Sequence, residues 1–170
     1  GRFAVEVIEA CRSEVGSDFP IILRWSQWKQ QDFTARLAST PQLLEAFLRP
    51  LIDAGVDAFH CSQRRFWEPE FDDSDMNLAG WVKKLTGMPT ITVGSVSLDQ
   101  DFVSQPSEGD GATSEPASID RLLEMMGRGD FDLVAVGRAL IANPDWPKVV
   151  RSGDTVGLQA YNKDLLAQLA

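Results

Sequence analysis

The chain has 170 residues, of which 44% are hydrophobic, and a formal net charge of −9 at pH 7. This length and composition predict one globular domain with a substantial core, whereas the acidic balance argues against a nucleic-acid-binding surface. Without a bilayer-spanning apolar run or a signal peptide, the sequence predicts a cytoplasmic protein with no membrane contact. Two scattered cysteines and one histidine argue against a disulfide framework or a metal site.

The chain begins with an amphipathic segment. Apolar residues recur at helical spacing from Phe3 to Val15, and Gly16 follows as a stop signal, so we expect a helix there. Cys11 falls on the apolar side of this helix and is expected to be a buried free thiol. The apolar run at 19–25 predicts a buried strand.

Three further helix-and-strand units follow. Helices are predicted from Thr40-Pro41 to Ile52, from Leu78 to Leu85, and from Ser118 to Met126, and strands at 56–61, 90–93 and 131–136. A short last helix is possible at 161–170. Two long loops interrupt the pattern, at 27–39 and at about 104–118, and the second is predicted to be mobile because it is rich in Ser, Gly, Pro, Glu and Asp.

The alternation of short apolar strands with helices predicts an α/β fold with a parallel sheet. We interpret residues 1–170 as one domain of four β/α units, equivalent to strands five to eight of a (β/α)8 TIM barrel. Half a barrel leaves strand edges and an apolar face uncovered. We therefore expect a partner, either an N-terminal half-barrel polypeptide or a second copy of the chain.

Two strands end in a glycine followed by a residue that can contact an anion: Thr90-Ile91-Thr92-Val93-Gly94-Ser95 and Leu133-Val134-Ala135-Val136-Gly137-Arg138. Glycine lets the backbone come close to a ligand, and free N–H groups at a turn favour negative charge. In (β/α)8 barrels the loops after strands seven and eight often hold phosphate in this way. The pair therefore predicts a phosphate site.

Four segments together resemble the old yellow enzyme family of flavin-dependent ene-reductases, also called NADH:flavin oxidoreductases, in its C-terminal half. The segments are Arg2-Phe3, Pro20-Ile21-Ile22-Leu23-Arg24-Trp25-Ser26, Val93-Gly94-Ser95, and Val136-Gly137-Arg138-Ala139-Leu140-Ile141-Ala142-Asn143-Pro144-Asp145-Trp146. The last segment is the most specific of the four. The resemblance extends over almost the whole chain.

The resemblance implies an FMN enzyme that uses NADH or NADPH to reduce activated C=C bonds of small-molecule enones. Arg24 would face the N1/C2=O edge of the flavin and stabilise negative charge on the reduced ring. Gly94, Ser95, Gly137 and Arg138 would hold the FMN phosphate. Gly137 and Arg138 follow directly on the fourth strand, as the family pattern requires.

The loop after the second strand carries Phe66 and Trp67, which the resemblance places at the substrate mouth. The alternative is an aromatic pair that packs this loop onto the barrel. No catalytic residue is expected in this chain, because the family's carbonyl-binding pair and its tyrosine would precede residue 1. His60 and Tyr161 do not match those positions.

Two other functions are compatible with the residues. A non-redox (β/α) enzyme half could use Gly94 and Gly137 to hold a phosphorylated substrate, although it would need an acid/base pair that the sequence does not contain. A non-catalytic half-barrel could serve as an assembly module.

Overall fold

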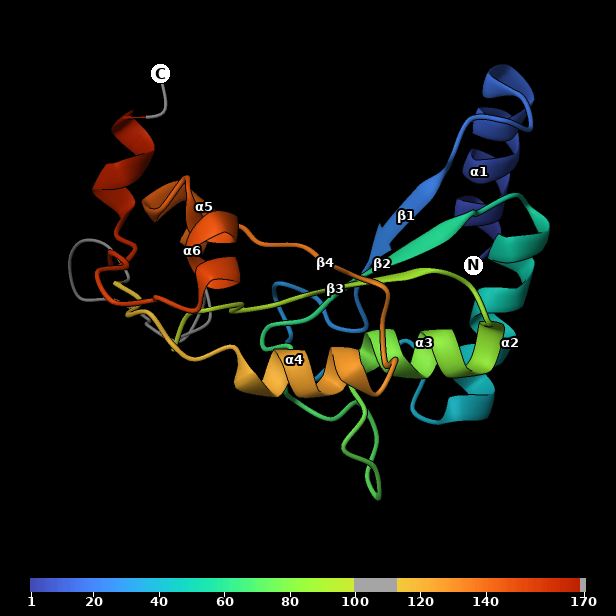
Figure 1. Cartoon of the computed structure of the whole chain (residues 1–170). Helices are drawn as coiled ribbons and strands as arrows, with labels where there is room; N and C mark the ends of the chain where they lie inside the picture. Colours follow the sequence, from blue (N-terminus) through green and yellow to red (C-terminus); the bar gives the residue numbers. More distant parts are fainter. Residues whose placement is uncertain (100–112, 169–170) are drawn as a thin grey trace.

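The computed structural model describes residues 1–99 and 113–168 (Figure 1). Four strands form one parallel sheet in the order β1-β2-β3-β4. The strands are β1 (Ile22–Trp25), β2 (Ala58–Ser62), β3 (Thr90–Val93) and β4 (Leu133–Val134). This confirms the predicted α/β fold with a parallel sheet. Most of the loop predicted to be mobile, residues 104–112, lies outside the described residues.

Helices connect and follow the strands. They are α1 (Arg2–Val15), α2 (Pro41–Asp53), α3 (Leu78–Thr86), α4 (Asp120–Gly127), α5 (Arg138–Ala142), α6 (Trp146–Ser152) and the 3-10 helix η1 (Lys163–Gln168). Within the described ranges, no helix is both long enough and apolar enough to cross a bilayer.

Local capping explains where the crossover helices begin and end. The Thr40 hydroxyl accepts the Leu43 amide at 3.2 Å, and the Asn77 side chain accepts the Gly80 amide at 2.9 Å. These are the bonds that an N-cap residue makes to otherwise unsatisfied amides. Gly87 ends α3 in the left-handed conformation, which glycine adopts more readily than other residues.

One face of the sheet is covered by helices. Burial alternates along β2 and β3, so that Phe59 and Cys61 on β2 and Thr90 and Thr92 on β3 are buried. Helices α2, α3 and α4 lie along one side of the strands in Figure 1, and the core forms between them and these residues. This packing fixes the positions of the strands, and so of the points from which the loops at their carboxyl ends begin.

The outer strands of the sheet expose apolar side chains. Ile22 on β1 is 53% exposed, so the prediction of a buried first strand is wrong, and Leu133 on β4 is 58% exposed. On α1 only Ile8 is buried, while Phe3 and Val7 are exposed. The expectation that Cys11 is a buried thiol is wrong, because it is exposed on the same side of α1, which no described residue covers.

The structure also differs from the predicted elements near the C-terminus. Strand β4 has two residues rather than six. Helix α4 begins at Asp120 rather than Ser118, and it buries Leu122 and Met125 while Leu123 and Met126 are exposed. The short helices α5 and α6 were not predicted, since they are too short to show helical periodicity. The last segment is a 3-10 helix.

Candidate functional site

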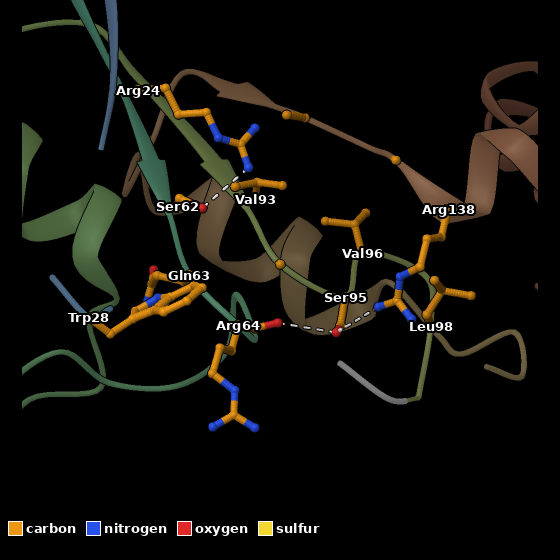
Figure 2. Close-up of a pocket in the computed structure, with 13 residues that line it drawn as sticks. Arg24, Trp28, Ser62, Gln63, Arg64, Val93, Ser95, Val96, Leu98 and Arg138 are labelled. Carbon is orange, nitrogen blue, oxygen red and sulfur yellow. Dashed lines mark hydrogen bonds between the residues drawn. The ribbon is translucent and has the colours of Figure 1, made fainter. Parts of the chain in front are cut away.

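A cavity of about 290 Å³ opens at the carboxyl ends of the strands (Figure 2). It is lined by all five residues that the sequence assigns to cofactor binding, which are Arg24, Gly94, Ser95, Gly137 and Arg138. They come from β1, from the turn after β3 and from the junction of β4 with α5. The prediction that these five residues lie together is confirmed. Their roles in binding a cofactor stay predictions.

The turn after β3, called here the β3 turn (residues 94–98), is closely packed. Gly94 has φ +133°, and a Cβ built on it would lie 2.6 Å from the Gln63 carbonyl oxygen. The Phe66 amide donates to the Gly94 carbonyl at 3.0 Å, and the Ser95 hydroxyl donates to the Arg64 carbonyl at 3.2 Å. Position 94 therefore requires glycine because the backbone of residues 63 and 64 leaves no room for a side chain. The sequence did not reveal this reason.

The turn after β4, called here the β4 turn (residues 135–137), is open. Gly137 is exposed, and a Cβ built on it would meet no atom within 4 Å. It precedes α5, whose first amides lie at the start of a helix and lack intrahelical acceptors. The backbone at Gly137 can therefore be approached by a ligand.

Arg138 reaches from α5 across the β3 turn. Its Nη1 donates to the Ser114 hydroxyl at 2.7 Å, its Nη2 lies 3.4 Å from the Ser95 hydroxyl, and its guanidinium lies 5.7 Å from the centroid of the Tyr161 ring. Ser114 is fully buried and pairs with Tyr161 through both backbone amides. These contacts hold the positive charge of Arg138 at the cavity.

Arg24 lies at the other end of the cavity, near Val93 (Figure 2). Its Nη2 donates to the Ser62 hydroxyl at 3.3 Å, and its Nη1 lies 3.4 Å from Nε2 of His60, the residue opposite it on β2. Burial, and secondarily the Arg24 charge, lower the pKa of His60, so the ring is neutral at pH 7 and can accept from Arg24. No carboxylate among the described residues pairs with Arg24.

Two cavity residues were missed by the sequence reasoning. Trp28 and Arg64 carry no motif that marks them as site residues, yet both line the cavity. Phe33 joins them, because its ring centroid lies 5.3 Å from that of Trp28 and 4.5 Å from the Arg64 guanidinium. Their position in long loops gave no periodic signal that could have identified them.

Phe66 and Trp67 do not line this cavity. Phe66 is 3% exposed within the core, and Trp67 packs edge-on against it with a centroid distance of 5.0 Å. The side-chain Nδ2 of Asn77 donates to the Phe66 carbonyl at 2.8 Å and fixes the loop there. The pair has the packing role that the sequence left open, and a substrate contact stays a prediction.

The comparison of sequences finds a relative but no matching family model. The chain is 30% identical over 160 residues to an NADH oxidase from Thermoanaerobacter brockii. This match includes 89% of the chain but 21% of the relative, so the chain spans about a fifth of that protein.

Solved structures with the same fold include old yellow enzyme homologues. An old yellow enzyme homologue from Zymomonas mobilis matches with a TM-score of 0.60 at 16% identity, over 93% of this chain and 38% of the other. Morphinone reductase in complex with tetrahydroNAD matches with a TM-score of 0.59 at 18% identity, over 91% and 34%. The old yellow enzyme from Trypanosoma cruzi gives 0.54 at 16% identity, over 87% and 32%.

The sequence match and the fold matches agree with the motifs around Arg24, Gly94 and Gly137. The resemblance of this chain to the old yellow enzyme family is thereby confirmed.

Proposed function

We propose that this chain is the flavin-binding part of an FMN-dependent oxidoreductase that uses NADH or NADPH to reduce activated C=C bonds of enones. The observation that carries the proposal is the cavity that joins Arg24 to the β3 and β4 turns. Cofactor sites commonly lie at the carboxyl ends of parallel strands, as this cavity does.

The residues at the cavity fit an anionic cofactor. Arg24 has no carboxylate partner among the described residues, although the whole chain carries a net charge of −9. At the opposite end, Gly137 leaves the backbone open, and Arg138 brings a second positive charge. The Gly137 and Arg138 amides and the Arg138 guanidinium would bind the phosphate, because charge-assisted hydrogen bonds to anions are the stronger ones.

Arg24 would bind the ring system. FMN supplies hydride transfer between the nicotinamide and the double bond. A fixed positive charge at the flavin edge favours the reduced, anionic ring and so raises its reduction potential. The neutral His60 and the Ser62 hydroxyl hold the guanidinium without cancelling its charge.

The rest of the active site would come from outside these 170 residues. The chain spans 32–41% of the length of the solved structures that it matches. We propose that the exposed edges at Ile22 and Leu133 pair with the strands of another half-barrel, which is a separate polypeptide segment or a second copy. That half would also supply the groups that bind the enone carbonyl and donate the proton.

Sedimentation tests the assembly. Covering the apolar side chains of both outer strands stabilises the sheet at about 25 cal/mol per Å² of apolar area. We therefore expect the 170 residues to sediment as a dimer, or as a complex with a second polypeptide. A cooperatively melting monomer would contradict the half-barrel assembly.

A visible absorbance spectrum of the purified protein tests the cofactor. We expect the bands of an oxidised flavin, their bleaching by NADH or NADPH under anaerobic conditions, and their return when an enone is added. Phosphosugar binding without flavin bands would favour the non-redox alternative. The absence of both flavin bands and phosphosugar binding would favour the assembly module.

A further inference from the structure

The loop after β1, called here the first loop (residues 26–40), is closed by the side chain of Gln27. Its Nε2 donates to the Ala38 carbonyl at 2.9 Å, and its Oε1 accepts the Ala38 amide at 2.9 Å. The side chain thus pairs with a backbone unit as another strand would. Because Gln27 is 2% exposed, these bonds lie away from water and fix both ends of the loop, including Trp28 in the cavity wall.

Glu70 ties this closure to the loop after β2, called here the second loop (residues 63–77). Its Oε1 accepts the other Nε2 hydrogen of Gln27 at 3.1 Å and lies 3.6 Å from Nε of Arg36. The Glu70 side chain is 5% exposed, whereas that of Arg36 is 44% exposed. One carboxyl group therefore joins two loops from inside the protein.

The junction adjoins the proposed cofactor cavity. A smaller cavity of about 80 Å³ is lined by Gln27 and Glu70, and it shares Trp28, Ser62, Gln63 and Arg64 with the main cavity. Movement of either loop would therefore change the wall that a ligand contacts. Trp28 would report such movement most directly, because it follows Gln27 in the sequence.

We propose that Gln27 and Glu70 form a latch that positions Trp28 in the cavity wall, and that the latch is closed when Glu70 is protonated and loosens when Glu70 ionises. The effect on FMN rests on the proposed function, whereas the latch itself does not depend on which ligand binds.

The burial of Glu70 supports this direction. Burial is the largest effect and raises the pKa of Glu70 to about 7, although Arg36 and Gln27 oppose it. Of the other titratable groups, the Cys61 thiol on β2 is neutral because burial raises its pKa. Arg64 and Glu68 line the smaller cavity, and Asp72 lines an open pocket on the other side of Glu70.

The sign follows from proton linkage. A carboxyl group exposed in an open state regains its ordinary pKa of 4.5, so the closed state binds the proton more tightly. The closed state is therefore most favoured below pH 4.5 and loses that advantage as the pH rises to about 7. The closed-to-open ratio should fall by about two orders of magnitude over this range.

The protonated latch keeps its central bond. A neutral carboxyl group still accepts a hydrogen bond through its carbonyl oxygen, so Gln27 remains bound. Arg36 loses an ionic partner, but its half-exposed side chain is hydrated at little cost. Ionisation instead places a charge on a side chain that is only 5% exposed, and the ion pair with Arg36 at 3.6 Å offsets only part of the cost of burying that charge.

The indole N–H of Trp28 provides the measurement. This group is buried and has no hydrogen-bond partner among the described residues, so opening to water should shift its NMR signal. We would label the tryptophans of the full chain with ¹⁵N, together with any partner that copurifies, and assign the Trp28 signal with Trp28→Phe. We expect the wild-type signal to titrate between pH 4.5 and about 7, the range over which the latch loosens.

Two matched variants test the cause. Glu70→Gln should hold the signal at its acidic position at every pH, whereas Glu68→Gln, in the same loop, should titrate as the wild type does. The proposal is overturned if Glu70→Gln still titrates, stays at the alkaline position or fails to fold, because the uncharged form should be the closed one. With rising pH, FMN affinity in the wild type should fall relative to that in Glu70→Gln, since the second ionisation of the FMN phosphate, at about pH 6, affects both proteins alike. A titrating latch without FMN binding would contradict the proposed function alone.

Discussion

The β3 turn and the β4 turn have the same sequence pattern, an apolar strand followed by glycine and a polar residue, but opposite surroundings. At the β3 turn, the backbone of residues 63 and 64 occupies the space beside Gly94. At the β4 turn, the space beside Gly137 is open. One glycine is therefore explained by packing within the protein, and the other leaves room for a ligand. A strand-end glycine alone does not identify a phosphate site.

The largest expected effect is a loss of stability from a substitution in the β3 turn. Gly94→Ala places a Cβ against the Gln63 carbonyl and forces an alanine to adopt a backbone φ of +133°. We expect the free energy of unfolding to fall by about 3 kcal/mol, because backbone strain and overpacking add together. Urea denaturation measures this loss, and an unchanged midpoint would show that the crossing chain moves freely.

The matched change at the β4 turn should affect binding more than stability. Gly137→Ala meets no neighbouring atom, so we expect a smaller loss of stability than for Gly94→Ala. If phosphate approaches the backbone there, FMN affinity should fall by about tenfold or more, equivalent to ~1.4 kcal/mol. Titration with FMN decides, and undiminished affinity would place the phosphate elsewhere.

Arg24 acts at the other end of the cavity from Arg138, so its change should separate ring effects from phosphate effects. Arg24→Met should weaken stabilisation of the reduced flavin by about 2 kcal/mol and so lower its midpoint potential. The oxidised FMN should still bind, since the β4 turn is intact. A redox titration with an unchanged midpoint would exclude contact of Arg24 with the ring.

A smaller effect is expected at the support of Arg138. Ser114→Ala removes the hydroxyl that accepts from Arg138 at 2.7 Å and should cost about 1 kcal/mol of stability. FMN affinity should fall less than in Gly137→Ala, because Ser95 and Tyr161 still contact Arg138. Equal losses in the two variants would show that the guanidinium, rather than the backbone, dominates phosphate binding.

The sequence predicted the features that depend on periodicity and on caps. The helices that begin after Thr40 and at Leu78 were predicted. The meeting of Arg24 with both turns was also predicted, because the carboxyl ends of parallel strands share one edge. The burial of Cys11 was mispredicted because a helical pattern shows an apolar face without showing what covers it.

Contacts between loops could not be predicted. Trp28 and Arg64 reach the cavity through long irregular segments, and Gln27 and Glu70 meet across 43 positions of sequence. Neither hydrophobic periodicity nor glycine placement carries information on such pairs. The hydrogen bond from the Asn77 side chain to the Phe66 carbonyl could not be predicted for the same reason.

The central claim is that this chain binds the phosphate of FMN at the β4 turn and Arg138. Parallel titrations of the full chain with FMN and with riboflavin, which lacks the phosphate, test it most directly. We predict that FMN binds at least about tenfold more tightly, and that Gly137→Ala removes most of this difference. Equal affinities for FMN and riboflavin in the unaltered chain would contradict the claim.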